Sequence, residues 1–290
     1  MTEERPLRIA AVSFLNARPL TYGLERLSAG RVDLRFGVPS RCAALLAAGE
    51  VDLALLPIAS YAAASEDLHI VPGIAIAARG AVRTVLLVGT VPWEEMTEIA
   101  LDPASRSSVV LVQLLTAAKG LVPAFRPWDQ SDVLAAVTRT RGALVIGDAA
   151  FAAKTFPYVY DLGTAWTAAT GLPFVFAVWA GRPHAVARED IALLQDSLRQ
   201  GLDHLDDIVE TADIECSRLG LTSAELSSYL GQSIRYELGP DAISGAATFL
   251  DEAAARGLLP ARVRLRLYDL GSGGDGTTTT TRYQLLDARQ

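Results

Sequence analysis

Three short polar segments of the sequence carry residues suited to holding an anionic ligand, and each follows a predicted β-strand. The first segment, residues 13–18, contains Asn16 just ahead of a predicted helix. The amide of an asparagine can both donate and accept hydrogen bonds, so Asn16 could orient a polar ligand. A local Asx-turn or a helix cap is the alternative role of an asparagine at such a place.

The second segment, residues 101–108, combines three hydroxyls with one guanidinium at the start of a predicted helix. The hydroxyls belong to Ser105, Ser107 and Ser108, and the guanidinium belongs to Arg106. Backbone N–H groups at a helix N-terminus lack intrahelical partners, and together with the helix dipole they attract anions. The segment therefore predicts a site for a carboxylate or a phosphate, with ordinary capping by Ser105 or Ser107 as the alternative.

The third segment is Gly147-Asp148, at the end of a predicted strand over residues 143–146. Glycine lets the backbone approach a neighbouring group closely, and Asp148 is placed to cap the helix that follows. An ion pair across a cleft is the other role open to Asp148. Ser40 has the residue type of an N-cap for the helix that begins near it, and we include it among the candidate substrate-binding residues.

Sequence motifs for nucleotide cofactors and for the commonest serine nucleophile are absent. No GxGxxG follows the first strand, and neither a Walker A pattern nor a GxSxG elbow occurs. The two cysteines, Cys42 and Cys216, lie far apart, and the three histidines are scattered. Structural zinc sites need clustered nitrogen and sulfur ligands, so we expect neither a metal site nor a cofactor.

The composition restricts the partners of the chain. It has 290 residues, half of them apolar, and a formal net charge of −7, and its Lys and Arg residues form no long run. Neutralising the phosphates of a nucleic acid requires a basic patch, so nucleic acid is not an expected partner. No run reaches the roughly 18 apolar residues that span a bilayer. Because Glu3 and Glu4 also stand where a signal peptide would be basic, we expect a cytoplasmic protein with no membrane partner.

Apolar periodicity predicts two βαβαβ units, over residues 7–56 and 98–146. The remaining predicted elements are strands at 70–78, 82–88 and 174–180, a loop at 163–173, and a helical region from residue 185. Open parallel sheets bind ligands beyond the carboxyl ends of their strands. Two such units facing each other would therefore place the ligand in a cleft between them.

The expected architecture is an α/β fold of two lobes. Lobe one comprises residues 1–88 and 178–270, and lobe two comprises residues 89–177, so the chain crosses between the lobes twice. The tail over residues 271–290 is rich in Gly and Thr and lacks an apolar pattern. Such a segment has no core to join, and it is predicted to be disordered.

Five blocks of the sequence resemble the chorismate dehydratases of the futalosine route to menaquinone. They are RIAAVSFLNARPLTYGL, PSRCAALLAAGEVDLALLPIASY, LDPASRSSVVLVQLL, ALVIGDAAF and DLGTAWTAATGLPFVFAVWAGR, and they fall in the family's order over about residues 8–182. The resemblance implies a periplasmic-binding-protein-like fold of type II, with a ligand cleft between two α/β lobes. The sister enzyme, dihydroxynaphthoate synthase, shares this fold but opens with a different motif that is absent here.

The resemblance implies a hydro-lyase that dehydrates chorismate to 3-[(1-carboxyvinyl)oxy]benzoate without a cofactor. Asn16 aligns with the family's important asparagine, and we expect it to orient the substrate while the substrate's enolpyruvyl carboxylate takes the ring proton. Ser107 and Ser108 match a hydroxyl pair whose backbone N–H groups would bind a carboxylate. Thr84 stands where the family usually carries Ser; it keeps the hydroxyl and adds a methyl group. Arg106, Ser40, Gly147 and Asp148 complete the expected substrate-binding set.

Three other classes of protein share the expected architecture. A solute-binding protein would capture an anion without changing it, but the absence of a recognisable signal peptide argues against this class. The sister synthase is a second alternative. The effector-binding domain of a transcription factor is a third, and no helix-turn-helix precedes Leu7. The expected partner is a small dicarboxylate, chorismate, and the sequence does not indicate an oligomeric state.

Overall fold

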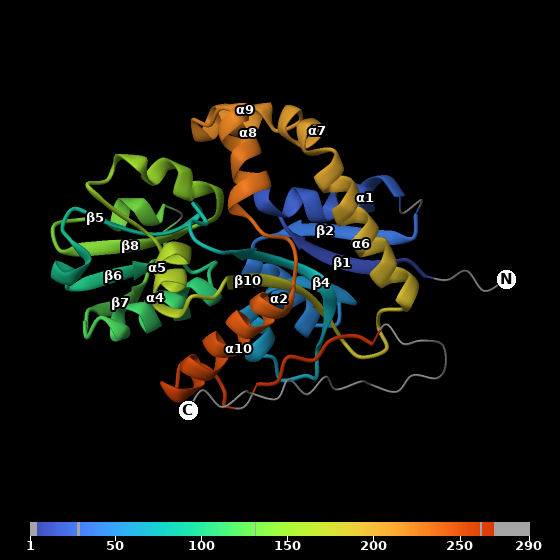
Figure 1. Ribbon diagram of the computed structural model, residues 1–290, viewed down its shortest axis with the longest axis horizontal. Coiled ribbons are helices and arrows are strands. Elements are labelled where there is room, and N and C mark those ends of the chain that lie inside the picture. Colours follow the sequence, from blue (N-terminus) through green and yellow to red (C-terminus); the bar gives the residue numbers. More distant parts are fainter. Residues whose placement is uncertain (1–4, 28–29, 131, 262, 270–290) are drawn as a thin grey trace.

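The fold is known from a computed structural model that describes residues 5–27, 30–130, 132–261 and 263–269. Two five-stranded sheets lie next to each other and carry helices on their faces (Figure 1). We call each sheet with its helices a lobe. The tail at residues 271–290, for which the sequence predicts disorder, lies outside the described residues. No helix among the described residues combines the length and apolar character needed to cross a membrane.

Lobe one is built on a sheet with the strand order β2-β1-β3-β10-β4. Its first three strands run parallel, and β10 pairs antiparallel with both β3 and β4. The βαβαβ unit expected at the start of the chain is therefore confirmed. The elements of this lobe are β1 (Leu7–Val12), α1 (Arg18–Leu27), β2 (Val32–Gly37), α2 (Pro39–Ala47), β3 (Leu53–Pro57), α3 (Ile58–Ala62), β4 (His69–Ala78) and β10 (Phe174–Gly181).

Lobe two is built on a sheet with the strand order β7-β6-β8-β5-β9. Strand β6 pairs in parallel with β7 and β8, as the second βαβαβ unit requires, whereas β5 runs antiparallel to β8 and β9. The elements are β5 (Val85–Gly89), η2 (Trp93–Glu95), β6 (Glu98–Leu101), α4 (Ser107–Ala118), β7 (Ala124–Pro127), η3 (Val133–Ala136), β8 (Arg141–Ile146), η4 (Gly147–Thr155), β9 (Tyr158–Asp161) and α5 (Leu162–Thr170).

The two crossings between lobes lie earlier in the chain than the sequence suggests. All of β5 belongs to the second sheet and all of β10 to the first, so the crossings run over residues 79–84 and 171–173. The expected boundaries at 88/89 and 177/178 fall inside these two strands. Both strands are largely buried and apolar, so their pattern identifies them as strands without showing which sheet they join.

The predicted loop over residues 163–173 is mostly helix. Helix α5 begins after Asp161, whose side chain accepts a hydrogen bond from the backbone N–H of Thr164. It ends at Gly171, which has a φ of 72°, the left-handed conformation that terminates many helices. The helix contacts both α4 and β5, and this packing stabilises a segment that is short and weakly periodic.

The C-terminal helices join the two lobes. Helix α6 (Arg188–Asp203) packs along α1, and Ser197 Oγ donates a hydrogen bond to the carbonyl of Leu20. The chain then forms an arch over the two lobes in Figure 1, consisting of α7 (Leu205–Glu210), α8 (Asp213–Leu219), α9 (Ser223–Ser228) and the π-turn η5 (Tyr229–Ser233). Helix α8 contacts η4 of lobe two. Residue 235 forms a β-bridge with Ala77, and α10 (Pro240–Ala255) follows.

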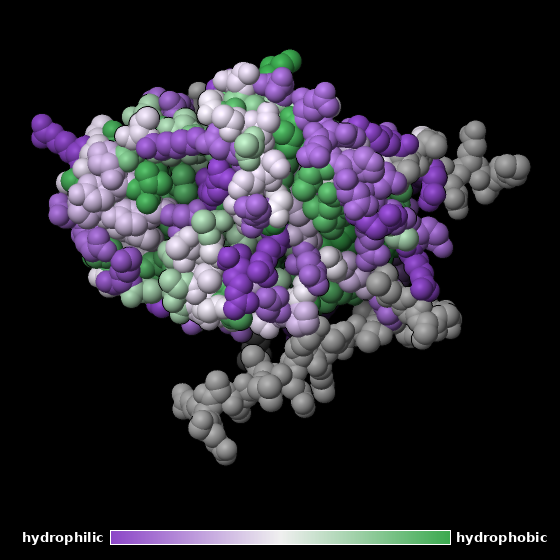
Figure 2. All heavy atoms as spheres, turned by 45° about the horizontal axis from the view of Figure 1, so that its top comes forward, coloured by the Kyte–Doolittle hydropathy of each residue, from purple (hydrophilic) through white to green (hydrophobic). Residues whose placement is uncertain are grey.

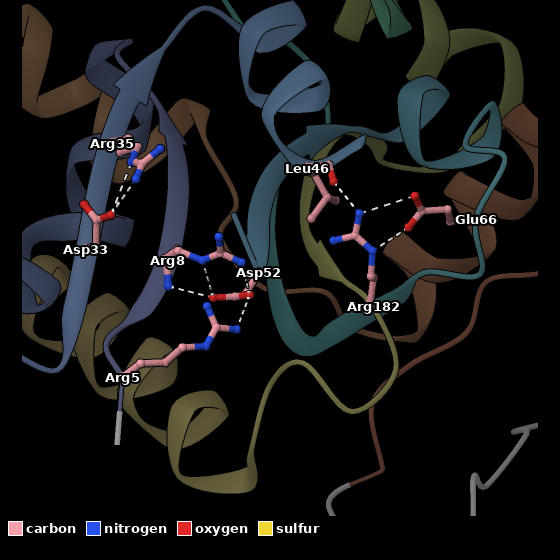
Figure 3. Close-up of polar contacts among 8 residues, drawn as sticks. All are labelled: Arg5, Arg8, Asp33, Arg35, Leu46, Asp52, Glu66 and Arg182. Carbon is pink, nitrogen blue, oxygen red and sulfur yellow. Dashed lines mark hydrogen bonds and ion pairs between the residues drawn. The ribbon is translucent and has the colours of Figure 1, made fainter. Parts of the chain in front are cut away.

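Charged side chains cluster at the edge of the first sheet where β1 and β3 begin, which we call the amino edge. Asp52 accepts hydrogen bonds from Arg5 and Arg8, and Arg182 pairs with Glu66 (Figure 3). On the outside of the molecule, polar residues cover much of the face in Figure 2, with smaller apolar patches between them. The opposite, carboxyl edge of the sheet faces lobe two.

Candidate functional site

A cavity of about 70 Å³ lies between the lobes at the carboxyl edge of the first sheet. It brings together six of the eight residues predicted from sequence: Asn16, Thr84, Arg106, Ser107, Ser108 and Gly147. Ser40 and Asp148 are not among its lining residues. Its remaining wall is almost wholly apolar, with Phe14, Ile76, Ile146 and Phe176 as the largest side chains. The cavity thus combines a few polar groups with an apolar wall, which is the usual composition of a small-molecule site.

Asn16 lies on η1 (Leu15–Ala17), directly after β1, and only 9% of the residue is exposed. Its Nδ2 donates a hydrogen bond of 3.1 Å to the hydroxyl of Tyr229. Its Oδ1 is buried and has no partner among the described residues. Since no backbone N–H of the described residues donates to this oxygen, the side chain serves neither an Asx-turn nor a cap. The unpaired oxygen is available to a ligand.

Tyr229 also reaches Thr84, with 2.8 Å between the two hydroxyl oxygens. Thr84 is 1% exposed and lies on the first crossing between the lobes, next to β5. Burial raises the pKa of Tyr229 well above its ordinary value, so this hydroxyl keeps its proton at neutral pH. Sequence reasoning missed Tyr229, because a tyrosine inside a helical region has the pattern of an ordinary core residue.

The N-terminus of α4 forms another wall of the cavity. Ser107 Oγ accepts a hydrogen bond of 3.1 Å from the backbone N–H of Ala59 in lobe one and donates one of 3.3 Å to the carbonyl of Phe176. No side chain caps this helix, so capping by Ser105 or Ser107 is not observed. The first backbone N–H groups of α4 therefore remain available to an anion. Arg106 beside them is exposed and makes no ion pair within the described part of the chain.

Gly147 fits where no other residue would. Its φ is 63°, and a Cβ built on it would lie 2.7 Å from the ring of Phe14 in the other lobe. Glycine is thus required both by the left-handed backbone and by the close approach of an aromatic ring. The expected role of Gly147, close approach of the backbone to a neighbour, applies here to a contact between the lobes.

Asp148 does not cap the helix that follows it. Its carboxylate instead accepts the backbone N–H of Leu15 across the cleft, with its two oxygens 3.2 and 3.3 Å from that nitrogen. Burial raises the pKa of Asp148 to about 6, against the opposing effects of the Leu15 hydrogen bond and the nearby charge of Arg18. Arg18 itself pairs with Glu215. The link from Asp148 to the other lobe is therefore a hydrogen bond to the backbone rather than the ion pair considered from sequence.

Ser40 does not have the capping role predicted for it. Helix α2 begins at Pro39, its N-cap is Val38, and no side chain caps it. Proline is favoured at the first helical position because it has no N–H to leave unpaired. The helix starts two residues earlier than expected, with Val38 rather than Ser40 as its N-cap, and Pro39 rather than Ser40 lines the cavity.

Comparison with known families identifies the chain. A family model described as menaquinone biosynthesis matches residues 7–255. The chain belongs to this menaquinone-biosynthesis family. A curated chorismate dehydratase from Thermus thermophilus is 31% identical to this family member over 253 residues, which is 81% of this chain and 90% of the relative. The alignment therefore includes almost the whole of the relative.

Solved structures show the fold of this family member. A protein from Archaeoglobus fulgidus has a TM-score of 0.68 at 14% identity, covering 89% of this chain and all of its own. The periplasmic aliphatic sulphonate binding protein SsuA from Escherichia coli has a TM-score of 0.63 at 15% identity, covering 90% of this chain and 96% of its own. Identities this low show the fold alone. The predicted periplasmic-binding-protein-like fold is confirmed.

In this menaquinone-biosynthesis protein, contacts between the lobes lie around the cavity, and some of them involve residues that line it. Contacts between the lobes join Leu15 to Asp148, Ala59 to Ser107, and the ring of Phe14 to the backbone at residue 147. A cavity of about 70 Å³ is small beside the roughly 300–1,000 Å³ typical of ligand pockets. A ligand of ordinary size therefore needs more space than this cavity offers.

Proposed function

We propose that this member of the menaquinone-biosynthesis family is a chorismate dehydratase, a hydro-lyase that converts chorismate into 3-[(1-carboxyvinyl)oxy]benzoate and water. The curated relative in Thermus thermophilus carries that activity in its name. The observation that carries the proposal is the shared cavity, in which Asn16 and the N-terminus of α4 approach each other from opposite lobes. A diacid with an apolar ring suits a site of this composition.

One carboxylate of chorismate would bind at the N-terminus of α4. The N–H groups of Ser107 and Ser108 supply hydrogen-bond donors there, and the helix dipole favours negative charge. Arg106, which lines the same cavity and makes no ion pair within the described residues, would add a full positive charge. Guanidinium and carboxylate groups match in geometry, so Arg106 would also fix the direction of the substrate.

The ring of chorismate would occupy the apolar part of the cavity, with its hydroxyl near Asn16. Phe14, Ile76 and Phe176 would pack against its faces. The unpaired Oδ1 of Asn16 would accept a hydrogen bond from the ring hydroxyl and so set the direction in which that group departs. An amide is neither a base nor an acid near neutral pH. Asn16 would therefore orient the substrate without exchanging protons with it.

The net reaction removes one ring hydrogen as a proton and the ring hydroxyl as hydroxide, which leave together as water. We propose that the enolpyruvyl carboxylate of the substrate accepts the ring proton and passes it to the departing hydroxide, which restores the carboxylate and releases water. The substrate has this role because the cavity wall offers no side chain that is an evident base. Loss of water makes the ring aromatic, and the reaction is strongly downhill. The protein's task is then mainly positioning, which can lower a barrier by roughly 7–11 kcal/mol in favourable cases.

The proposal is tested by incubating the purified protein with chorismate and following ultraviolet absorbance and product mass. A product lighter than chorismate by one water, with a benzoate-type spectrum, is the expected result. Tight binding of unchanged chorismate would instead make the chain a solute-binding protein. If chorismate is neither bound nor converted, the assignment fails and the sister synthase becomes the next candidate.

A further inference from the structure

We propose that Tyr229 is a positioning residue for Asn16. The hydroxyl of Tyr229 determines which end of the Asn16 amide meets the substrate. The inference rests on the proposed function, because it concerns the same cavity and the same reaction. Tyr229 does not line the cavity and would not touch the substrate. Its effect on turnover would pass entirely through the amide it holds.

Tyr229 is held rigidly in place. It lies on η5, is fully buried, and its ring meets the ring of Phe151 edge-on with 5.2 Å between their centroids. Phe151 belongs to η4 of lobe two, so the tyrosine connects the C-terminal arch to the second lobe. From this position its hydroxyl oxygen lies 3.1 Å from Asn16 Nδ2 and 2.8 Å from Thr84 Oγ1.

The direction of donation along this series of hydrogen bonds follows from its last acceptor, the carbonyl of Val82. Thr84 Oγ1 lies 3.4 Å from the carbonyl oxygen of Val82, which can only accept. If Thr84 donates to Val82, its oxygen is free to accept from Tyr229, and the tyrosine oxygen in turn accepts from Asn16 Nδ2. Burial keeps Tyr229 protonated, so this donation persists at neutral pH. Each hydroxyl and the Asn16 Nδ2 atom then donates to an acceptor, and within this network Asn16 Oδ1 is the one atom that has no partner among the described residues.

The reversed amide would present the wrong group to the substrate. With the amide turned over, Tyr229 would donate to Oδ1 and the NH₂ group would be left for the ligand. A ring hydroxyl approaching as a donor would then meet another donor. The amide of Asn16 is symmetric in shape, so only its hydrogen-bond partners distinguish its two orientations. Tyr229 and Thr84 together supply that distinction.

Tyr229→Phe tests the inference, with Tyr236→Phe as the matched control. Removal of the Tyr229 hydroxyl is expected to lower kcat by about 30-fold and to change KM by less than about threefold, because ground-state binding of the carboxylates persists. Tyr236 is equally buried, and its hydroxyl donates to the backbone carbonyl of Asn16 at 3.0 Å. Tyr236→Phe therefore removes a buried hydroxyl that also bonds Asn16, but it leaves the side-chain amide of Asn16 bonded to Tyr229. The kcat of this variant is expected to stay within about threefold of wild type.

Thr84→Val provides a second measurement that does not depend on Tyr229→Phe folding well. When Thr84 Oγ1 is removed, the Tyr229 hydroxyl loses its acceptor and donates instead to Asn16 Oδ1, which holds the amide in the reversed orientation. Thr84→Val should then have a lower kcat than Tyr229→Phe. Adding Tyr229→Phe to Thr84→Val removes the donor and should raise kcat above that of Thr84→Val alone. Two independent structural defects would lower it further instead.

The outcomes separate the inference from the proposed function. Wild-type protein that leaves chorismate unchanged refutes the dehydratase assignment. If wild type turns chorismate over, the positioning role is overturned by any of three results: a Tyr229→Phe kcat within about threefold of wild type, an equal loss in Tyr236→Phe, or a double variant slower than Thr84→Val. A loss confined to Tyr229→Phe together with recovery in the double variant supports it.

Discussion

The two edges of the first sheet treat their polar groups in opposite ways. At the amino edge Asp52 accepts hydrogen bonds from Arg5 and from both the side chain and the backbone of Arg8 (Figure 3). At the carboxyl edge Asn16 keeps a buried oxygen with no partner in the described structure. Satisfied polar groups stabilise a fold, whereas a buried unsatisfied one raises its energy until a ligand pairs with it. The amino edge therefore contributes to stability, whereas the carboxyl edge keeps a polar atom available to a ligand.

Two carboxylates, those of buried Asp52 and partly buried Asp148, show the same contrast. Burial by itself would raise the pKa of Asp52, but the hydrogen bonds from Arg8 and Arg5 outweigh it and lower the pKa to about 2. Burial raises the pKa of Asp148 to about 6, because one backbone N–H and more distant charges compensate it only in part. The same residue type is therefore held as a stable anion at the amino edge of the first sheet and as a readily protonated group where lobe two meets the carboxyl edge.

The largest expected effect follows from removing the unpaired amide. Asn16→Ala should lower kcat by about a thousandfold, the loss typical of deleting one positioned hydrogen-bonding group from an active site. Chorismate affinity should change by less than about tenfold, because the α4 N-terminus is untouched. Steady-state kinetics and calorimetric titration measure the two quantities separately. An Asn16→Ala protein with full activity would rule out the role given to this residue.

Asp52→Asn should lower stability and leave turnover unchanged, the opposite of what is expected for Asn16→Ala. The folded pKa of Asp52 is depressed, so its contribution is complete above its ordinary pKa of 3.8 and is lost as the pH falls toward about 2. We expect the variant to lose about 2 kcal/mol of unfolding free energy at pH 7. Urea unfolding measures this loss, and turnover of chorismate should stay near the wild-type value.

Asp33→Asn is the matched control for Asp52→Asn. Asp33 pairs with Arg35 on the same strand, β2, and both side chains are more than 40% exposed. Exposed ion pairs contribute less than about 1 kcal/mol. Equal losses from the two substitutions would mean that burial and double pairing do not set Asp52 apart, and would remove the basis for contrasting the two edges.

Asp148→Asn should change the pH dependence of stability in the opposite sense to Asp52→Asn. The folded pKa is raised, so the folded protein binds the proton more tightly than the unfolded chain, and stability falls as the pH rises from 3.8 to about 6. Asparagine keeps an acceptor for the N–H of Leu15 and does not titrate. We expect the curve of unfolding free energy against pH to become flatter across this window, by on the order of 1 kcal/mol. An unchanged slope would contradict this account of Asp148.

Local patterns in the sequence were sufficient to locate most of the cavity. Asn16, Ser107 and Gly147 each follow a strand whose apolar run and polar end are visible in the sequence. Parallel strands bring their carboxyl ends to one edge, so three segments far apart in sequence could be expected to meet. The parallel strands of both βαβαβ units were predicted from apolar periodicity, and the binding-protein-like fold from the resemblance to the family. The second helix expected in the second unit is only the short 3-10 helix η3.

The features that escaped prediction depend on contacts between distant segments. Tyr229 reaches Asn16 through an arch of helices whose path no local pattern specifies, and Asp148 bonds a backbone N–H rather than a recognisable side-chain partner. Strands β5 and β10 are apolar enough to lie at the centre of either sheet, so the lobe to which each belongs depends on the packing of the whole chain. Side-chain types predict such contacts poorly. The contact of Asp148 has a backbone group as its partner, and Asn16 and Tyr229 are far apart in the sequence.

Glu66→Gln should cause the smallest loss of unfolding free energy among these variants. Glu66 pairs with Arg182 at the amino edge, but both side chains are roughly a third or more exposed. Arg182 also donates to the carbonyl of Leu46, and its own carbonyl accepts from Tyr268, so its position does not depend on Glu66. We expect a loss of roughly 0.5 kcal/mol in urea unfolding and no change in turnover. A loss as large as that of Asp52→Asn would mean that the ion pairs of this edge act as one cooperative network, whose members must then be removed together to measure what the edge contributes.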